Sequence, residues 1–408
     1  MKKRLLLIHP PFVRKINGQL PLNLVYLAAA VEKSVDIKVK ILDMNIGQNL
    51  SRTLAEFNPT HVGITRYTPN NQECLKILKQ IKNSKTGITL ISGGPHEWSR
   101  SSITQRSAPW IDHVVAARDG ERELAKIMTG DTQINLDWRE LFPAYHLLDM
   151  SEASYSFDQN VFSAAKMLTY LSARGCNLKC SFCSAGDYRP VPIELVIGHL
   201  KKIVDMGYQA LFFNDANFAA DLERTRQLMQ LIIQEGLNKK LIWGCQTTAN
   251  TFLSEKIVAL MAEAGCVYVT YALETVSPLG LKRIKKKLSP QVVADKCFTA
   301  KRYGMKLGLY VMFGMHTSQH EDYYWARKTL DQVAEIQPDF VSYSILADYP
   351  HTRPDLNWEN EKFSSEKVWE FFDEGISFHP HCSADYAEQI RSEILKRHQT
   401  DLQQTKIF

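Results

Sequence analysis

The run Ala173-Arg-Gly-Cys-Asn-Leu-Lys-Cys-Ser-Phe-Cys-Ser-Ala-Gly186 contains three cysteines, Cys176, Cys180 and Cys183, in the spacing C-x3-C-x2-C. No fourth cysteine follows at a comparable spacing. A [4Fe–4S] cluster is usually bound by four thiolates, so three thiols on one short loop would leave one iron with an open position. By analogy with catalytic zinc, an open position allows a metal site to bind and activate a small molecule.

A structural zinc site and a chance spacing are the alternatives to a cluster at this loop. Zinc sites usually combine two C-x2-C pairs, or a cysteine pair with a histidine pair. The sequence near the loop contains no such second pair. The iron–sulfur interpretation is therefore favoured over both alternatives.

The other cysteines do not suggest a disulfide framework. The chain has eight cysteines in 408 residues, and five of them are single and scattered: Cys74, Cys245, Cys266, Cys297 and Cys382. Such residues are mostly small, buried and apolar. This use of cysteine fits a reducing compartment, which an oxygen-labile cluster also requires, so we expect a cytoplasmic protein.

Length and composition indicate a globular protein of two or three domains, with 408 residues of which 45% are hydrophobic. The net charge of +5, from 49 basic and 44 acidic residues, does not indicate nucleic-acid binding. The apolar run near the N-terminus ends at Pro10 and Pro11, too early for a signal peptide. No stretch approaches the roughly 18 apolar residues of a membrane span, so we expect a soluble protein.

In residues 1–130, short apolar runs alternate with helical patterns, which predicts an α/β domain with a doubly wound parallel sheet. The expected strands are 4–9, 36–42, 61–65, 88–92 and 111–115, and the expected helices are 22–32, 75–82 and 121–128.

Ligands of such sheets bind at the carboxyl ends of the strands, which directs attention to the loops that follow them. These loops contain Pro10-Pro11, residues 65–69, which begin with Thr65, and the run Ser92-Gly93-Gly94-Pro95-His96. The two glycines would let the backbone approach a large ligand, although an ordinary tight turn accounts for them equally well. No G-x-G-x-x-G motif is present, so a dinucleotide is disfavoured.

After a linker at 131–160, residues 161–350 predict a partial (β/α)6 barrel of the TIM type, followed by a short helical extension at 351–408. The cysteine loop follows the first barrel strand, at the carboxyl end where the chemistry of such barrels takes place. The expected strands are 167–173, 210–214, 241–246, 267–273, 306–313 and 340–346, and the expected helices are 193–206, 222–235, 255–264, 290–303 and 321–335.

The cysteine motif, with Phe182 just before its third cysteine, closely resembles that of the radical S-adenosylmethionine (SAM) superfamily. In that family the three cysteines bind a [4Fe–4S] cluster, and the amino and carboxylate groups of SAM chelate the fourth iron. One electron from the cluster cleaves SAM to methionine and a 5′-deoxyadenosyl radical. The resemblance also implies an electron donor such as flavodoxin or ferredoxin.

The same resemblance assigns SAM contacts to Phe182 and to three further residues. Asn214 and Asp215, which end the second barrel strand, would contact the SAM amino group, although an Asx turn before Asp221 is an alternative. Glu274, which ends the fourth strand, would accept the ribose hydroxyls, with a surface salt bridge as its alternative. The run Lys282-Arg-Ile-Lys-Lys-Lys287 offers a cation for the SAM carboxylate, but the sequence does not say which lysine is used.

Pro10-Pro11, residues 20–29 and Gly93-Gly94-Pro95-His96 together resemble the cobalamin-binding domain of B12-dependent radical SAM enzymes. In that class a flavodoxin-like Rossmann domain carries cobalamin, and the resemblance places it near Pro10, Thr65, Ser92, Gly93, Gly94 and His96. The Asp-x-His-x-x-Gly motif, whose histidine binds cobalt in other B12 proteins, is absent. His96 could be a cobalt ligand or an ordinary polar loop residue.

The resemblance therefore implies an enzyme that uses a [4Fe–4S] cluster, SAM and cobalamin to methylate an unactivated carbon of a small-molecule substrate. One alternative keeps these cofactors and performs a cyclisation or rearrangement without net methyl transfer. A methylthiotransferase is disfavoured because only Cys74 precedes Cys176. A non-catalytic cobalamin-binding protein is a further alternative, but the intact cysteine motif argues against it. The sequence does not reveal the substrate.

Overall fold

A computed structural model describes residues 3–12, 20–67, 70–84, 86–150, 155, 162, 167–250, 252–346, 384–397 and 405–407. The chain divides into two compact units, one formed by residues 1–157 with 354–373 and the other by residues 158–353 with 374–408. Several residues of the expected linker, and Cys382 with most of the expected C-terminal extension, lie outside the described residues.

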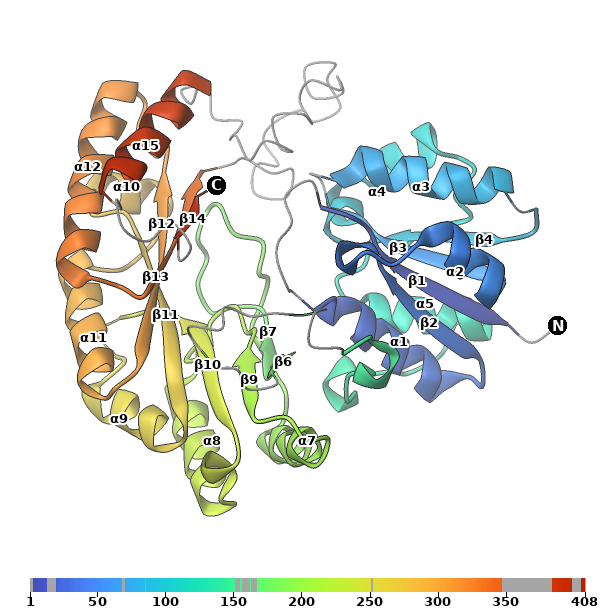
Figure 1. Cartoon of the computed structure of the whole chain (residues 1–408), viewed down its shortest axis with the longest axis horizontal. Helices are drawn as coiled ribbons and strands as arrows, with labels where there is room; N and C mark the ends of the chain where they lie inside the picture. The colour runs from blue at the N-terminus through green and yellow to red at the C-terminus, as the bar shows by residue number, and fades with distance from the viewer. Residues whose placement is uncertain are drawn as a thin grey trace. The chain divides into compact units, whose positions relative to one another are not determined.

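The first unit contains a five-stranded, fully parallel sheet with the order β2-β1-β3-β4-β5 (Figure 1). This order is that of flavodoxin-like folds, so the expectation of a doubly wound sheet is confirmed. The strands are β1 (Arg4–His9), β2 (Lys38–Asp43), β3 (His61–Thr65), β4 (Thr89–Gly93) and β5 (His113–Val114).

Helices cover both faces of this sheet, because its strands are apolar on both sides. The helices are α1 (Leu22–Ser34), α2 (Leu50–Phe57), α3 (Asn71–Ser84), α4 (Pro95–Ser107) and α5 (Gly120–Thr129). Helix α1 packs beside α5 on one face, and α3 and α4 lie on the opposite face (Figure 1). The alternate residues Leu6 and Ile8 of β1 pack against Cys74, Ile77 and Leu78 of α3, as the two-residue period of a strand requires.

Helices α2 and α4 were not expected from the sequence. Helix α4 begins directly after Gly94, so Pro95 is its first residue and His96 lies in its first turn, not in the expected loop. Proline suits the first helical position because its missing N–H would have no helical partner there. The residues of α4 are mostly polar, so they carry little of the apolar periodicity that reveals a helix.

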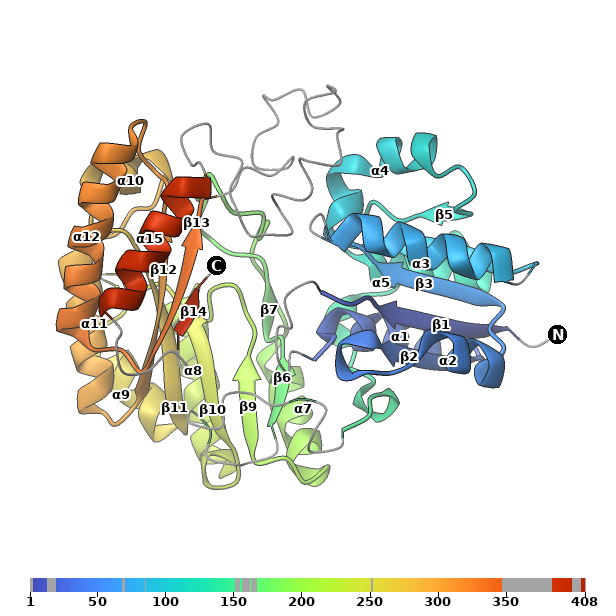
Figure 2. The same cartoon turned by 45° about the horizontal axis from the view of Figure 1, so that its top comes forward.

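The second unit contains a curved sheet with the order β14-β13-β12-β11-β10-β9-β6, in which all neighbouring strands are parallel (Figure 2). It contains the expected six strands of a partial barrel and adds a seventh, β14, from near the C-terminus. The strands are β6 (Met167–Tyr170), β9 (Ala210–Phe213), β10 (Ile242–Thr247), β11 (Cys266–Glu274), β12 (Lys306–Phe313), β13 (Phe340–Ile345) and β14 (Thr405–Ile407).

Helices line the outer side of this curved sheet (Figures 1 and 2). Four of them begin at an N-cap side chain, Asp221, Ser254, Ser277 or Ser318, which accepts a hydrogen bond from a backbone N–H of the first turn. The helices are α7 (Ile193–Asp205), α8 (Leu222–Gln234), α9 (Glu255–Glu263), α10 (Pro278–Arg283), α11 (Pro290–Arg302), α12 (Gln319–Ile336) and α15 (Ala384–Arg397). Of these, α10 was not expected from the sequence, and α15 lies in the C-terminal extension that was expected to be helical.

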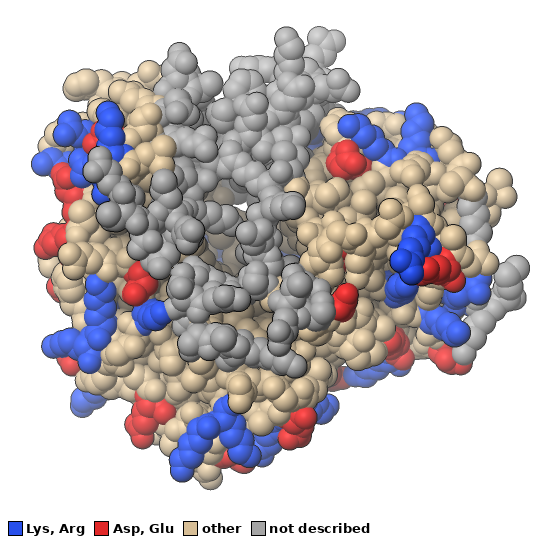
Figure 3. All heavy atoms as spheres, viewed as in Figure 1, with Lys and Arg blue, Asp and Glu red and all other residues tan. Residues whose placement is uncertain are grey.

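Basic and acidic side chains are interspersed on the face shown in Figure 3, without one extended patch of either sign. Among the described helices, none combines the length and the apolar character that crossing a bilayer requires.

Candidate functional site

The cysteine loop is closed at its base by a short antiparallel pair, β7 (Ala173–Arg174) and β8 (Arg189–Pro190). The backbone N–H of Cys176 donates to the carbonyl of Gly186 at 3.0 Å, which joins the two ends of the loop. Gly175 has a φ of +79°, and a Cβ there would collide with the backbone carbonyl of Asp187. Only glycine fits this crossing, so the loop conformation is fixed immediately before its first cysteine.

The three cysteines differ in their exposure to solvent. Cys176 is buried, Cys180 is partly buried and Cys183 is exposed, and all three are free thiols. The backbone N–H of Leu178 points at the sulfur of Cys176 from 3.4 Å, a contact that stabilises a thiolate. Among the described residues, no three His, Cys, Asp or Glu side chains converge on one metal ion. A [4Fe–4S] cluster does not require the three cysteines to converge on one ion, because each thiolate binds a different iron.

The segment around α10 holds the middle of the loop against the barrel. The backbone N–H of Ser181 donates to the carbonyl of Ile284 at 3.0 Å. Phe182 packs against an apolar cluster that contains Leu281, Ile284 and Met315. The expected SAM contact Phe182 therefore has a packing role in this structure, as the anchor of the loop.

Glu274 and Lys286 form a buried ion pair beside the cysteines. The Nζ of Lys286 lies 2.9 Å from Oε1 of Glu274, and each side chain is 8% exposed. Burial alone would lower the pKa of Lys286, but the negative charges of Glu274 and the Cys180 thiolate raise it above its ordinary value. Burial raises the pKa of the Cys180 thiol, and Lys286 opposes that shift.

The structure singles out Lys286 within the basic run, because Lys282, Lys285 and Lys287 are all exposed. Glu274 closes β11 at a register shift against β12 and has a φ of +59°, a conformation that glutamate rarely adopts. Such strain persists only where the surroundings impose it, and it is common at functional sites.

Asp215 is engaged differently from the expected SAM contact. Its two carboxylate oxygens accept hydrogen bonds from the backbone N–H of Ser172 at 2.7 Å and from the Ser172 hydroxyl at 2.6 Å. Burial raises its pKa to about 6, against which the Ser172 hydrogen bonds act. Arg224 reinforces this site by donating to the carbonyls of Ser172 and Val191. Asp215 therefore holds the chain that leads into the cysteine loop, whereas the neighbouring Asn214 is exposed at the strand end.

Neutral polar groups connect the carboxyl ends of β9, β10 and β12. The hydroxyl of Tyr310 donates to Oε1 of Gln246 at 2.7 Å, and the Gln246 amide donates to the carbonyl of Asp215 at 3.0 Å. Burial, with a smaller effect of Glu274, raises the pKa of Tyr310 to about 12, so this hydroxyl keeps its proton. Asn217 links the same edge to the cysteine loop through the side chain of Asn177, at 3.1 Å.

His316 lies buried in the loop after β12. Asp322 accepts hydrogen bonds from the backbone N–H groups of Gly314, Met315 and His316, which fixes this loop. The imidazole stacks on Trp325, with ring centroids 6.4 Å apart, and its Nδ1 lies 3.3 Å from Oε1 of Glu321.

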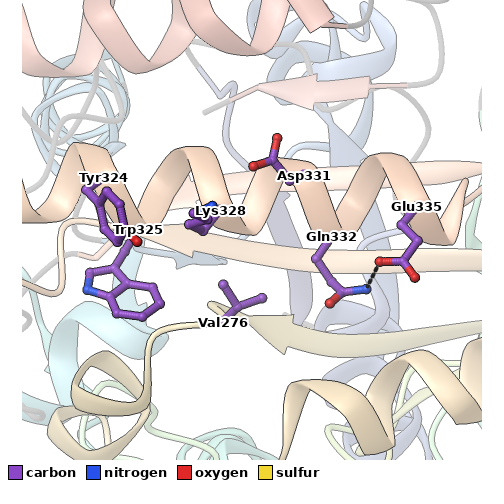
Figure 4. Close-up of a pocket in the computed structure, with 7 residues that line it drawn as sticks. All are labelled: Val276, Tyr324, Trp325, Lys328, Asp331, Gln332 and Glu335. Carbon is purple, nitrogen blue, oxygen red and sulfur yellow. Dashed lines mark hydrogen bonds between the residues drawn. The ribbon is translucent and has the colours of Figure 1, made fainter.

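Trp325 also borders a surface pocket of about 390 Å³ along α12 (Figure 4). The lining is Val276, Tyr324, Trp325, Lys328, Asp331, Gln332 and Glu335, with a hydrogen bond between Gln332 and Glu335. The pocket contains none of the three cysteines, so it is separate from the site described above.

In the first unit, three of the residues expected to contact cobalamin are buried and occupied by other partners. Thr65 Oγ1 accepts a hydrogen bond from the Asn23 amide at 2.8 Å. The hydroxyl of Ser92 donates to Oε1 of Glu97 at 2.5 Å. His96 is 2% exposed, and burial together with Arg66 and Arg100 holds its pKa well below the usual range.

A buried ion pair between Arg66 and Glu97 organises this edge, with the Nη1–Oε1 distance at 2.5 Å. Gly94 has a φ of +102°, and a Cβ there would come within 2.7 Å of the carbonyl oxygen of Arg66. The glycine thus permits close packing of the two loops that follow β3 and β4. Of the expected cobalamin contacts, Gly93 and Gly94 remain partly exposed, whereas Pro10 is buried, as are Thr65, Ser92 and His96.

Comparison with known proteins connects both units to described families. Residues 170–327 match the model of the radical SAM superfamily, and residues 17–127 match that of the B12 binding domain. Similar proteins include the uncharacterised methyltransferase PH0819 of Pyrococcus horikoshii, 27% identical over 390 residues that cover 86% of this chain and 82% of the relative. The anaerobic magnesium-protoporphyrin IX monomethyl ester cyclase of Cereibacter sphaeroides is 21% identical over 386 residues, which cover 86% of this chain and 62% of the relative.

Among solved structures, the radical SAM methyltransferase TsrM from Kitasatospora setae, with cobalamin and a [4Fe–4S] cluster bound, has a similar fold. The TM-score is 0.66 at 16% identity, and the alignment covers 86% of this chain and 76% of TsrM. At this identity the likeness establishes the fold. The two family models agree with the cysteine loop and with the folds of the two units, so the chain combines a B12 binding domain with a radical SAM domain.

Proposed function

We propose that this protein is a cobalamin-dependent radical SAM methyltransferase that acts on a carbon of a small-molecule substrate. The observation that carries the proposal is the cysteine loop at the carboxyl ends of a parallel sheet, in one chain with a flavodoxin-like unit of the B12-binding family. The relatives support methyl transfer, since both PH0819 and TsrM are described as methyltransferases.

The described residues fit the cluster by their chemistry. Cys176, Cys180 and Cys183 would bind it, on a loop whose conformation is fixed by Gly175 and by the anchor Phe182. When bound, the cluster would supply the electron that cleaves SAM, and cobalamin would carry the methyl group. The loop keeps Cys183 exposed, which leaves a route for an electron donor such as flavodoxin or ferredoxin. Such an oxygen-labile site suits the cytoplasm.

Three residues near the loop are suited to bind SAM. Lys286 would pair with the SAM carboxylate, because it is a buried cation beside Cys180. Glu274, released from part of that pairing, would accept the ribose hydroxyls, and the exposed amide of Asn214 would contact the amino group. Asp215 would act behind them as a positioning residue through Ser172.

On the first unit, the surface for cobalamin is the carboxyl edge of the sheet, where Gly93 and Gly94 are partly exposed. Arg66, Glu97 and Ser92 would support that surface from below. The substrate would be a small molecule, as it is for TsrM, whose structure has been solved with tryptophan bound.

The test is anaerobic reconstitution with iron, sulfide and cobalamin, followed by reduction with SAM labelled in its methyl group. The proposal predicts bound iron and cobalamin, 5′-deoxyadenosine after reduction, and a labelled methyl group in a small molecule from cell extract. A chain that binds iron but no cobalamin would contradict it. Lys286→Met should weaken SAM binding by about 10-fold, as expected for the loss of a charge-assisted contact, whereas Lys287→Met, on an exposed neighbour, should not.

The similarity to the magnesium-protoporphyrin cyclases supports one second candidate, a cyclisation or rearrangement without net methyl transfer. The same experiment distinguishes the two. A product that forms with 5′-deoxyadenosine but gains no label would select the cyclisation.

A further inference from the structure

A histidine and an aspartate meet at the carboxyl ends of two neighbouring strands of the first unit. His9 ends β1 and Asp43 ends β2, and the Nδ1 of His9 lies 3.0 Å from Oδ1 of Asp43. The side chains are 9% and 2% exposed. The two residues pair through the register of the parallel strands, in which His9 lies opposite Asp43.

Further contacts fix the aspartate as the hydrogen-bond acceptor of this pair. Oδ1 of Asp43 accepts from the backbone N–H of Asn45 at 2.9 Å, and Oδ2 accepts from the hydroxyl of Tyr155 at 3.0 Å. Both oxygens of Asp43 thus accept hydrogen bonds, as those of an ionised carboxylate do.

The tautomer of His9 follows from these contacts. An ionised carboxylate has no proton to give, so the Nδ1 of His9 must carry the hydrogen that it donates to Asp43. The amide nitrogen of Asn45 also lies 3.1 Å from Nδ1, but its two hydrogens have acceptors in the carbonyl of Pro10 and in Asp43. The lone pair of the neutral imidazole is therefore on Nε2, the nitrogen that faces away from Asp43.

The position of this pair is the ligand-binding edge of the fold. In the order β2-β1-β3-β4-β5, the strand sequence reverses between β1 and β3, and ligands bind outside the carboxyl ends of strands at such a point. The ring of Phe12 lies 5.5 Å from that of His9 and 5.4 Å from that of Tyr67, which follows β3. The imidazole is thus one end of an aromatic row that crosses this edge.

The other histidines of the unit are placed or held differently. His61 and His113 begin β3 and β5, at the opposite edge of the sheet, and His96 is buried beside Arg66 and Arg100. His146 is exposed in a short 3₁₀ helix at Tyr145–Leu147.

We propose that Nε2 of His9 is the nitrogen that this protein supplies to the cobalt of bound cobalamin, and that Asp43 is its positioning residue. Histidines that bind metals usually donate their other N–H to a carboxylate, which fixes the tautomer and raises the basicity of the ligating nitrogen. His9 and Asp43 provide that arrangement with residues 34 positions apart, so no short motif reveals it. The inference rests on the proposed use of cobalamin.

The test is electron paramagnetic resonance of the full chain with cobalamin bound and reduced to Co(II). A nitrogen bound to the axial position of Co(II) splits each cobalt line into three. In protein grown with 15N-labelled histidine, the proposal predicts two lines in place of three, because the nuclear spin of the nitrogen changes. This measurement uses the native sequence and needs no variant to fold.

Two variants sharpen the result. His9→Gln should retain cobalamin, measured by its absorbance, and lose the splitting, whereas His61→Gln, at the opposite edge of the sheet, should keep it. Bound cobalamin with no splitting, or splitting that is insensitive to labelled histidine, would overturn the inference and leave the proposed function standing. A purified chain that retains no cobalamin would overturn both, and the absorbance shows this before any resonance is recorded.

Discussion

The carboxyl ends of the two sheets carry their charged groups in opposite ways. In the first unit, Arg66 and Glu97 are almost fully buried under the loops that follow β3 and β4. In the second unit, the cysteine loop projects from β6 with Cys183 exposed. Polar residues at strand ends are thus of two kinds. Buried ones support the loops that form the surface, and exposed ones are available to a ligand. The distinction depends on burial, which sequence position alone does not supply.

The largest expected effect is in the exposed loop. Cys183→Ala should abolish iron binding at that corner of the cluster and SAM cleavage with it, because no other described cysteine is placed to replace the thiolate. Bound iron and 5′-deoxyadenosine are the measurements. Cys297→Ala, which removes a buried thiol from α11, should keep both. Equal losses in the two variants would show that the loop has no special role.

The buried pair of the first unit should affect stability most. Arg66→Met leaves Glu97 buried without its charge partner, which costs about 3–5 kcal/mol of the free energy of unfolding. The double variant Arg66→Met/Glu97→Leu should recover part of that loss, since it removes the unpaired charge as well. Urea unfolding measures both. If Arg66→Met instead kept its stability and lost cobalamin, the pair would belong to the ligand surface and the contrast between the two units would fail.

Most of the fold could be predicted because its strands are apolar on both sides and end at turn residues. The expected bounds of the strands at 4–9, 61–65 and 306–313 are confirmed to the residue. Helix α4 was missed because its buried face is polar: His96, Glu97 and Arg100 are all buried, and Glu97 accepts a hydrogen bond from Arg66. The expectation of a loop there was wrong because hydrophobic periodicity does not report a helix that packs on an ionic network.

The site was less predictable than the fold because its contacts are long-range. The cysteines share one loop, so their spacing alone was sufficient. The sequence does not distinguish Lys286 from its neighbours Lys285 and Lys287, whereas the structure shows that Lys286 alone of the three forms a buried ion pair with Glu274. Asp215 was expected to face SAM, but its partner Ser172 lies 43 residues away in sequence and could not be recognised there.

The burial of Asp215 predicts a pH effect of intermediate size. Its pKa rises from 3.8 to about 6 on folding, chiefly because burial disfavours the charged carboxylate. Below about pH 4 Asp215 is protonated in both the folded and the unfolded chain, so its ionisation does not lower the free energy of unfolding there. Between about pH 4 and pH 6 the unfolded chain releases the proton first, and the folded state loses stability as pH rises, by about 3 kcal/mol in total.

Asp215→Asn should remove this dependence while it keeps the contact with Ser172, because an amide can accept from the backbone N–H and donate to the hydroxyl. Urea unfolding of both proteins between pH 4 and 7 checks it. The difference between them should grow to about pH 6 and then stay constant. A difference that is independent of pH would mean that Asp215 is ionised in the folded state throughout this range.

The smallest expected effect distinguishes the two adjacent glycines of the first unit. Gly94→Ala should destabilise the protein by about 1–3 kcal/mol, because φ is +102° and the new Cβ would approach the Arg66 backbone to 2.7 Å. A Cβ added at Gly93 would lie 3.7 Å from the Cβ of Val115, which is an ordinary van der Waals contact. We therefore expect Gly93→Ala to leave the free energy of unfolding unchanged.

The same pair of variants separates packing from ligand approach. If Gly93 faces cobalamin, Gly93→Ala should lower the affinity for cobalamin without changing the urea midpoint, since only the ligand would meet the added methyl group. Gly94→Ala should change the midpoint first. If both variants changed only the affinity, the two glycines would serve the ligand alike, and the buried network beneath them would not be what requires Gly94.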